Sequence, residues 1–402
     1  MNSPPPSRKP RVAVVFGGRS SEHAISCVSA GSVLRAIDRD CYDVVPIGIG
    51  VDGRWVLAAD DPDRMVITEG VLPSVDPTGS SVLLAGDPTA RHLVISDPGQ
   101  VPGELGQVDV VFPVLHGPYG EDGTIQGLLE LAGVPYVGSG VLSSAVSMDK
   151  AAMKVMLAGA GLPVGPHLVI SGRDWPDHRQ PDGPAAGAGQ PASAPPTSPA
   201  APQILDQVRR QLTLPVFVKP ARAGSSVGIT KVKDWADLEA AVDTARQFDP
   251  KVVVEQAVEG REIECGVLET LDGSGVETSV CAEIVLPSSR EFYDFDAKYL
   301  SDSDPDTDST TLVVPADLPV EVSRQVRAMA VDAFRALECE GFARVDFFVG
   351  PQGTVTVNEV NTIPGFTPVS MFPLMWAATG VDYPTLVDRL IGSALRKRPG
   401  LR

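Results

Sequence analysis

Short apolar runs that end in glycine-rich turns organise the first third of the chain. The run Arg11–Phe16 ends in two glycines and is followed by Ser20–Glu22, a polar segment typical of a helix start. The run Val108–Leu115 likewise ends in a glycine-rich segment, His116–Gly123, before the helical pattern of Thr124–Leu131. Strands that alternate with helices predict an open, doubly wound parallel sheet with ligands at the carboxyl ends of its strands. Neither turn matches Gly-x-Gly-x-x-Gly, so no dinucleotide site is predicted.

The remaining apolar runs are short and closely spaced, which predicts hairpins. Leu214–Val218 and Ile229–Val232 flank a turn rich in glycine and serine, and Lys251–Glu255 is a third short strand. Gly341–Val349 and Thr354–Thr362 are separated by Gly-Pro-Gln-Gly, a typical turn sequence. We therefore expect short antiparallel strands in the second part of the chain.

The last hairpin should carry charged side chains on one face. Side chains alternate along a strand, so Arg344 and Asp346 share a face, as do Glu359 and Asn361 on the returning strand. If the four-residue turn closes symmetrically, Arg344 lies opposite Glu359, with Asp346 and Asn361 as their neighbours. Two carboxylates and an amide oxygen would then meet beside a guanidinium, an oxygen-rich set that suits magnesium. A polar, solvated hairpin face is the alternative.

Composition limits the classes of partner. The 402 residues include 51 acidic and 33 basic side chains, and the net charge of −18 disfavours nonspecific binding to nucleic acid or an anionic membrane. No apolar run is long enough for a membrane helix, and the start of the chain lacks the apolar segment of a signal peptide. We expect a cytoplasmic protein. The five cysteines are scattered without Cys-x-x-Cys spacing, so we expect buried free thiols rather than disulfides or a zinc site.

Two segments have little apolar content. Residues 171–202 are rich in proline and alanine and should form a disordered surface insertion. The acidic loop 299–312 is either a solvated linker or a mobile lid over a site. Along the chain we expect a disordered tail 1–10, an N-terminal α/β domain 11–138, a central domain 139–254 and a C-terminal domain 255–402.

The glycine- and serine-rich turn suggests a phosphate-binding loop. Lys219 ends the preceding strand, and Gly224–Gly228 follows it. Glycines let the backbone N–H groups approach an anion, and Ser225 and Ser226 add hydroxyl donors. Lys219 would add a point charge. The pattern is not a Walker loop, and a plain turn is the alternative.

Two further segments have weaker signals. Past the strand that ends at Glu255, a backbone amide and carbonyl could read an adenine edge, with Glu255 or Glu262 accepting from ribose hydroxyls. An exposed acidic turn is the alternative. Lys298 and Tyr299 follow an aromatic segment and could close over a small substrate, or they could be the end of an amphipathic strand.

The order of these segments resembles the D-alanine–D-alanine ligases of the ATP-grasp superfamily, over nearly the whole chain. The segments that carry the resemblance are Gly17–Ser26, His116–Gly123, Tyr136–Gly140, Met148–Lys150, Val218–Pro220, Gly224–Gly228, Ala297–Tyr299, Arg344–Asp346 and Asn358–Thr367. The resemblance implies an ATP-grasp fold: an open parallel α/β domain followed by two α+β domains that enclose ATP. It also implies ATP and two magnesium ions, which manganese can replace, and a homodimer.

The resemblance also assigns site residues. The ATP-binding set would be Lys150, Lys219, Gly224, Ser225, Ser226, Val227, Gly228, Glu255, Gln256, Ala257, Val258, Glu262 and Lys298. The metal ligands would be Asp346, Glu359 and Asn361, and the substrate-binding set Glu22, His23, Tyr299, Arg344, Gly365, Ser370 and Met371. The catalytic set would be Glu22, Ser225, Tyr299, Arg344 and Gly365, in which Glu22, Ser225 and Tyr299 form a hydrogen-bonded trio.

In such an enzyme ATP converts the first D-alanine to an acyl phosphate, and the amine of the second displaces phosphate. Tyr299 is typical of dipeptide formation in this family. Pro368 and Val369 depart from the usual, more polar sequence before the serine, which leaves the second substrate site in question. The alternatives are another ATP-grasp enzyme with different substrates and a catalytically silent nucleotide-binding paralogue.

Overall fold

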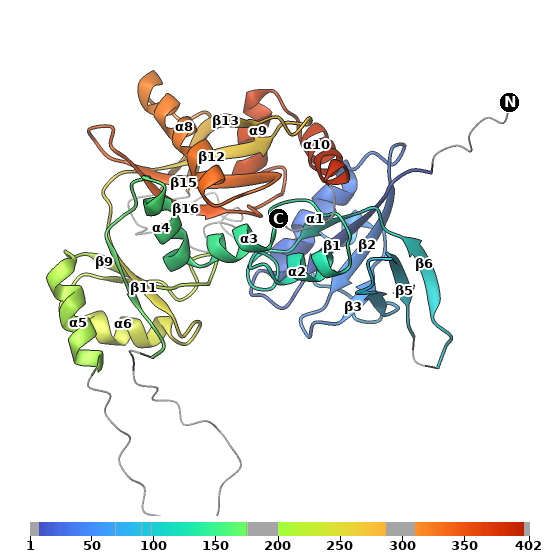
Figure 1. The fold of residues 1–402 in the computed structure, drawn as a ribbon, viewed down its shortest axis with the longest axis horizontal. Helices are drawn as coiled ribbons and strands as arrows, with labels where there is room; N and C mark the ends of the chain where they lie inside the picture. The colour runs from blue at the N-terminus through green and yellow to red at the C-terminus, as the bar shows by residue number, and fades with distance from the viewer. Residues whose placement is uncertain are drawn as a thin grey trace, which may run out of the picture. The chain divides into compact units, whose positions relative to one another are not determined.

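The computed structural model describes residues 8–286 and 310–397, apart from residues 69, 90, 98, 174 and 176–199 (Figure 1). The chain divides into two compact units: one comprises Met1–Val164 and Glu259–Arg402, and the other Gly165–Val258. Most of the expected insertion and most of the acidic loop lie outside the described residues. The three expected domain boundaries stay a prediction.

The first sheet confirms the predicted open α/β arrangement. Its strand order is β3-β2-β1-β7, in which β1 pairs in parallel with both β2 and β7 and the edge strand β3 is antiparallel. The strands are Arg11–Gly17 (β1), Asp43–Ile49 (β2), Trp55–Leu57 (β3) and Val110–Val114 (β7). Helix α1 (His23–Ala36) begins after Glu22, and α2 spans Thr124–Leu131 as predicted.

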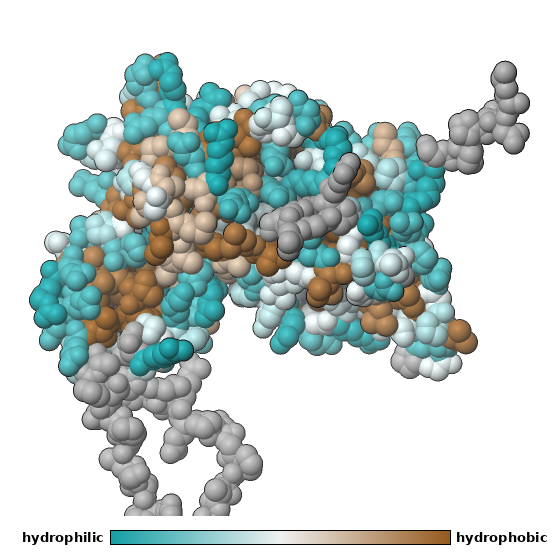
Figure 2. Space-filling model, in the orientation of Figure 1, coloured by the Kyte–Doolittle hydropathy of each residue, from teal (hydrophilic) through white to brown (hydrophobic). Residues whose placement is uncertain are grey.

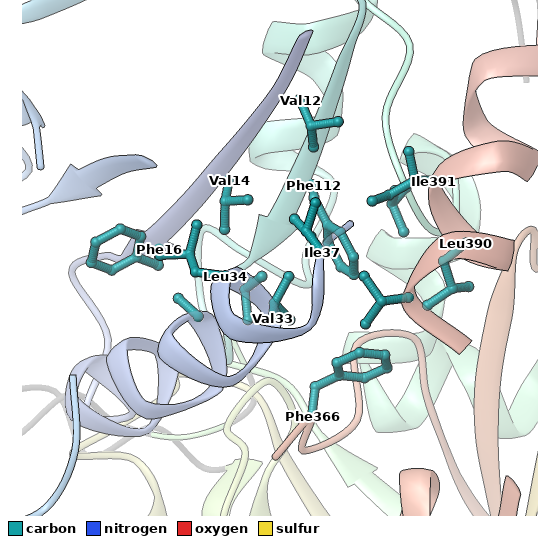
Figure 3. Packing of buried hydrophobic residues seen from close by; sticks show 14 of the residues in the cluster. Val12, Val14, Phe16, Val33, Leu34, Ile37, Phe112, Phe366, Leu390 and Ile391 are labelled. Carbon is teal, nitrogen blue, oxygen red and sulfur yellow. The ribbon is translucent and has the colours of Figure 1, made fainter. Parts of the chain in front are cut away.

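Alternate residues of β1 face two different cores because side chains alternate along a strand. Val12, Val14 and Phe16 pack with α1 and with α10 (Tyr383–Arg396), as Figure 3 shows. Ala13 and Val15 pack in a second core with residues of α2. Helices on both faces make the sheet doubly wound.

The second large sheet of this unit is antiparallel, with the order β14-β13-β12-β15-β16. Its strands are Arg261–Glu269 (β12), Val276–Val285 (β13), Thr311–Val313 (β14), Phe342–Val349 (β15) and Val355–Asn361 (β16). Ile263, Cys265 and Val267 of β12 pack with α8 (Val320–Ala336), whereas Leu268 packs with α9 (Met371–Thr379). Each face of the sheet is therefore covered by its own helix over part of its length.

The same unit holds several smaller elements. They are α3 (Val141–Met148), α4 (Lys150–Gly159), the 3₁₀ turn η1 (Pro62–Arg64) and the sheet of β4 (Val82–Leu84), β5 (His92–Ile95) and β6 (Gly103–Gln107).

The unit Gly165–Val258 is a four-stranded antiparallel sheet with the order β10-β9-β11-β8. Its elements are β8 (His167–Ile170), α5 (Ala200–Gln211), β9 (Val216–Pro220), β10 (Thr230–Val232), η2 (Trp235–Asp237), α6 (Leu238–Ala245) and β11 (Val252–Gln256). Val216, Val218 and Val254 pack with Val208 of α5 and Val242 of α6 in its core. The predicted hairpin around the glycine-rich turn is thus confirmed as β9 and β10.

Polar residues dominate the face seen in Figure 2, with apolar residues in smaller patches. Within the described part of the chain, no helix has both the length and the apolar character needed to cross a membrane. All five cysteines are free thiols, and four are buried. The expectation of burial was wrong for Cys41, which is exposed because it lies in the polar turn between α1 and β2.

Candidate active site

The predicted charged face is present on β15 and β16, but in a different register. Arg344 pairs with Asn361, and Asp346 pairs with Glu359. The prediction that Arg344 lies opposite Glu359 was therefore wrong. Partners directly across a sheet share a face, so the four polar side chains lie together as expected.

Two local features shift the register. The strand pairing ends at Val349 and Val355, so the loop is one residue longer than the predicted Gly-Pro-Gln-Gly turn. A second shift follows Asp346, where Asn358 is the extra residue of a β-bulge. Each feature moves the pairing by one position, and together they account for the difference.

Hydrogen bonds hold the guanidinium of Arg344 in a fixed orientation. Its Nε and Nη2 atoms donate to the two carboxylate oxygens of Asp346 at 2.8 and 2.7 Å, the side-on geometry of a strong pair. Asn361 Nδ2 also donates to Asp346, at 3.0 Å. Burial alone would lower the pKa of Arg344, but the charges of Asp346, Glu264 and Glu359 outweigh it and raise the pKa. Arg344 is thus a permanent positive charge at this face.

Glu264 belongs to this face and was not predicted. It lies on β12 directly opposite Asp346, and its Oε2 atom is 3.2 Å from Arg344 Nε. The residue is only 4% exposed. The alternation of Glu262 and Glu264 along one strand was the available signal, but the sequence does not show that β12 pairs with β15.

Helix α4 brings two lysines to β16. Lys150 Nζ is 3.8 Å from Glu359 Oε2, and the buried Lys154 donates to the backbone oxygen of Asn358 at 3.4 Å. Asp149 caps the helix by accepting from the first free N–H groups. Lys150 therefore lies beside the predicted metal ligands, as an ATP-phosphate lysine would have to.

The donor set suits a hard divalent cation. Asp346, Glu359 and Asn361 supply carboxylate and amide oxygens from one sheet face, and Asp346 is buried. Magnesium binds few protein oxygens and keeps water or phosphate as its other ligands. No cluster of three His, Cys, Asp or Glu residues that could hold a metal occurs within the described ranges, so the amide oxygen is needed to complete the set.

The first glycine-rich turns bring buried polar groups together. Glu22 and His116 are 7% and 4% exposed, and His116 Nδ1 lies 3.5 Å from a Glu121 oxygen. Burial lowers the pKa of His116, but the hydrogen bond and charge of Glu121, with the charge of Glu22, outweigh it and raise the pKa. A Cβ atom on Gly117, whose φ is +77°, would lie 2.6 Å from Glu22 Oε2. A side chain at this position would displace the Glu22 carboxylate from where it lies.

His23, a predicted substrate residue, contacts the protein through both ring nitrogens. Nδ1 lies 2.8 Å from the Gly18 oxygen, and the Val75 N–H donates to Nε2 at 3.2 Å. This arrangement assigns the proton to Nδ1. His23 therefore fixes the turn after β1, and its contact with substrate stays a prediction.

The loop between β16 and α9 is tied to the N-terminal sheet. His116 Nδ1 lies 3.1 Å from the Ile363 oxygen, and the Phe366 ring packs edge-on against Phe112 with centroids 5.9 Å apart (Figure 3). Ile363 and Phe366 flank Gly365 in sequence, so these contacts fix the position of its backbone. Ser370 receives a hydrogen bond from the Thr367 N–H at 3.1 Å, and the following residue, Met371, is buried.

The predicted phosphate residues of the other unit lie on β9 and the turn after it. Lys219 Nζ is 3.0 Å from Glu255 Oε2 on β11. Ser225 and Ser226 have φ values of +48° and +59°, a left-handed conformation that turns successive N–H groups toward one side and suits an anion. Gly228 adopts φ +72°. Lys219 and this loop therefore combine a positive charge with backbone donors.

Two backbone N–H groups of the predicted adenine segment already donate to backbone oxygens of the protein. The N–H groups of Gln256 and Ala257 donate to Pro166 and Pro215 oxygens at 2.9 and 3.0 Å. The Val258 N–H remains the candidate donor to an adenine edge. Glu262, the predicted ribose residue, belongs to the larger unit, where it lies on β12 on the same face as Glu264.

Lys298 and Tyr299 lie outside the described residues. The trio of Glu22, Ser225 and Tyr299 therefore stays a prediction.

Comparison with known proteins gives full-length matches. Residues 11–139 match the family described as "D-ala D-ala ligase N-terminus" and residues 194–392 that described as "D-ala D-ala ligase C-terminus". A D-alanine--D-alanine ligase of Streptomyces griseus is 55% identical over 401 residues, which covers 99% of this chain and 95% of that protein. One of Rhodococcus erythropolis is 52% identical and covers 98% and 100%.

Solved structures agree with these matches. The VanG D-Ala:D-Ser ligase of Enterococcus faecalis has a TM-score of 0.77 at 32% identity and covers 96% of this chain and 100% of its own. The D-alanine-D-alanine ligase of Coxiella burnetii has a TM-score of 0.71 at 33% identity and covers 96% and 94%.

The sheets, their charged side chains and these structural neighbours define an ATP-grasp ligase. Within that class, the chain belongs to the D-alanine–D-alanine ligase family. The fold and the family expected from the sequence are both confirmed.

Proposed function

We propose that this chain joins two molecules of D-alanine into D-alanyl-D-alanine for peptidoglycan synthesis. It is an ADP-forming, ATP-dependent ligase. The observation that carries the proposal is the face of β15 and β16, where Arg344 lies beside the oxygen donors of Asp346, Glu359 and Asn361. That arrangement suits a reaction in which negative charge is moved between phosphate and carboxylate oxygens.

The protein's part in such a reaction is positioning and charge neutralisation. Lys150, Lys219 and Lys298 would neutralise the phosphates of ATP, and the backbone of Gly224–Gly228 would close over them. Arg344 and the Gly365 N–H would stabilise the oxyanion that forms when the second amine attacks the acyl phosphate. No nucleophilic side chain is required for either step.

The proposed site on this face includes two metal ions. Asp346, Glu359 and Asn361 would hold two magnesium ions, with Glu359 shared and manganese as a substitute. Bound there, the ions would neutralise phosphate charge during transfer. Support comes from the oxygen-only donor set and from Lys150, which lies 3.8 Å from Glu359.

Substrate recognition would rest on buried charge and on the loop that carries Tyr299. Glu22, buried beside His116, would bind the ammonium of the first D-alanine, and Ser370 would anchor the carboxylate of the second. Tyr299 would exclude water from the acyl phosphate. The enzyme would act as a homodimer in the cytoplasm.

The test is a coupled measurement of phosphate and organic product. Purified protein is incubated with ATP, magnesium and D-alanine, and separately with D-alanine plus D-serine, D-alanine plus D-lactate, and L-alanine alone. The D-serine arm is included because one similar structure is a D-Ala:D-Ser ligase. We expect phosphate and D-alanyl-D-alanine in equal amounts with D-alanine alone. ATP binding without D-alanine-dependent turnover would refute the proposal.

A further inference from the structure

Glu264 is a buried carboxylate for which the proposed reaction has no role. It lies on β12 in the same row as Asp346 on β15 and Glu359 on β16. Its side chain is 6% exposed, and that of Arg344, 3.2 Å away, is 15% exposed. A carboxylate this buried is strongly destabilising unless a cation compensates it. Arg344 supplies that compensation.

In the proposed site, the protein donors and the metal ion would compete for the carboxylate oxygens of Asp346. Both of its oxygens accept from Arg344, and Oδ2 also accepts from Asn361. A magnesium ion would draw on the same lone pairs. The guanidinium would then lose part of the negative charge that fixes it.

Glu264 contacts the same guanidinium from the neighbouring strand. Its Oε2 atom lies at ion-pair distance from Nε, and the residue is not among the predicted metal ligands. The residue of β12 directly opposite Arg344 is Gly266, which has no side chain to contribute. Glu264 is therefore the carboxylate on β12 that can hold Arg344 independently of the metal.

We propose that Glu264 is a positioning residue that keeps the Arg344 guanidinium aimed at the reacting oxygens while Asp346 binds the metal. This inference rests on the proposed function. Loss of the Glu264 charge should let the guanidinium shift, and a shift of a stabilising donor reduces turnover more than it reduces ATP binding.

The test compares Glu264→Gln with a matched change in the same sheet. Glu283 on β13 also forms a partly buried ion pair, with Arg261 at 2.5 and 2.7 Å, but it faces the opposite side of the sheet. For Glu264→Gln we expect kcat to fall roughly 10- to 100-fold, short of the roughly 100- to 1,000-fold effect of deleting an oxyanion donor. The KM for ATP should stay within about twofold, and Glu283→Gln should leave kcat within about threefold.

Two measurements separate positioning from general stability. Crystal structures of wild type and Glu264→Gln with magnesium and ADP should show a displaced Arg344 guanidinium only in the variant. In an Arg344→Lys background, Glu264→Gln should cost less than about twofold in kcat, because residues that act through each other are not additive. If Glu264→Gln does not fold, Glu264→Asp keeps the charge but withdraws it by one methylene, and it should lower kcat in the same direction.

An unmoved guanidinium, or an equal loss of kcat in the wild-type and Arg344→Lys backgrounds, would overturn the inference. Equal effects of Glu264→Gln and Glu283→Gln would overturn it as well. A wild-type protein without D-alanine-dependent turnover is a different result, since it removes the proposed function itself.

Discussion

Asp249 should control the local stability of the predicted phosphate loop. Its buried carboxylate accepts four hydrogen bonds: from Arg222 N at 2.8 Å, Arg222 Nε at 2.9 Å, Arg222 Nη2 at 2.7 Å and Lys251 N at 2.9 Å. Each oxygen accepts two of the four. Asp249→Asn replaces one oxygen by an NH₂ group, so two of these bonds are lost whichever way the amide turns.

The expected magnitude follows from those two bonds. A lost bond to a partly buried backbone N–H costs about 1 to 1.5 kcal/mol. The bond to the Arg222 side chain, which is 50% exposed, is screened by solvent and contributes about 0.5 to 1 kcal/mol. The sum is about 2 kcal/mol, which corresponds to roughly 30-fold more frequent local opening.

Hydrogen exchange followed by mass spectrometry measures that opening directly. Backbone amides of residues 220–228 should exchange roughly 30-fold faster in Asp249→Asn. The control is Asp206→Asn in the same unit, because Asp206 pairs with Arg209 at 3.1 Å with both side chains well exposed; it should change exchange less than about twofold. Unchanged exchange in Asp249→Asn, or the same acceleration in both variants, would refute the reasoning.

The same carboxylate gives a pH dependence. Burial raises the pKa of Asp249, but the hydrogen bonds and charge of Arg222 and the Lys251 N–H outweigh it, so the pKa is lowered. A carboxyl with a lowered folded pKa stabilises the fold above its unfolded pKa of about 3.9 and loses that contribution as the pH falls through the folded value. Wild-type protection should therefore decrease below about pH 4, whereas Asp249→Asn should lack this component.

Three further changes test the fold and the site. Gly17→Ala should lower the midpoint of urea unfolding strongly, since Gly17 has φ +90° and a Cβ would lie 2.3 Å from the Ile49 oxygen. The control Gly127→Ala, with no atom within 4 Å of its Cβ, should be neutral or stabilising. Equal effects of the two substitutions would contradict the clash at Gly17. Glu359→Gln should reduce magnesium-dependent turnover roughly 1,000-fold, and a near-normal rate at saturating magnesium would exclude Glu359 as a ligand. Phe372→Ala, at a fully buried position, should cost about 3 to 5 kcal/mol in urea unfolding, and a loss below about 1 kcal/mol would show that the core closes around the cavity.

Much of the fold could be predicted because it follows from local pattern. Apolar runs and glycine-rich turns located β1 and β7, and helical spacing located α2 with its bounds. The alternation of side chains placed Arg344 and Asp346 on one face, since that alternation depends only on the strand being extended. The order of the motifs along the chain also identified the family.

The register of the site depended on contacts that no local pattern contains. A loop one residue longer than expected and a bulge at Asn358 moved Arg344 opposite Asn361, because the length of a turn and the position of a bulge are set by packing around the strand. Glu264 joined the site only because β12 pairs with β15, although about 80 residues separate them in sequence. Pairing between distant strands depends on how the whole sheet assembles, so the sequence supplied the side chains of this site and the tertiary structure determined which of them meet.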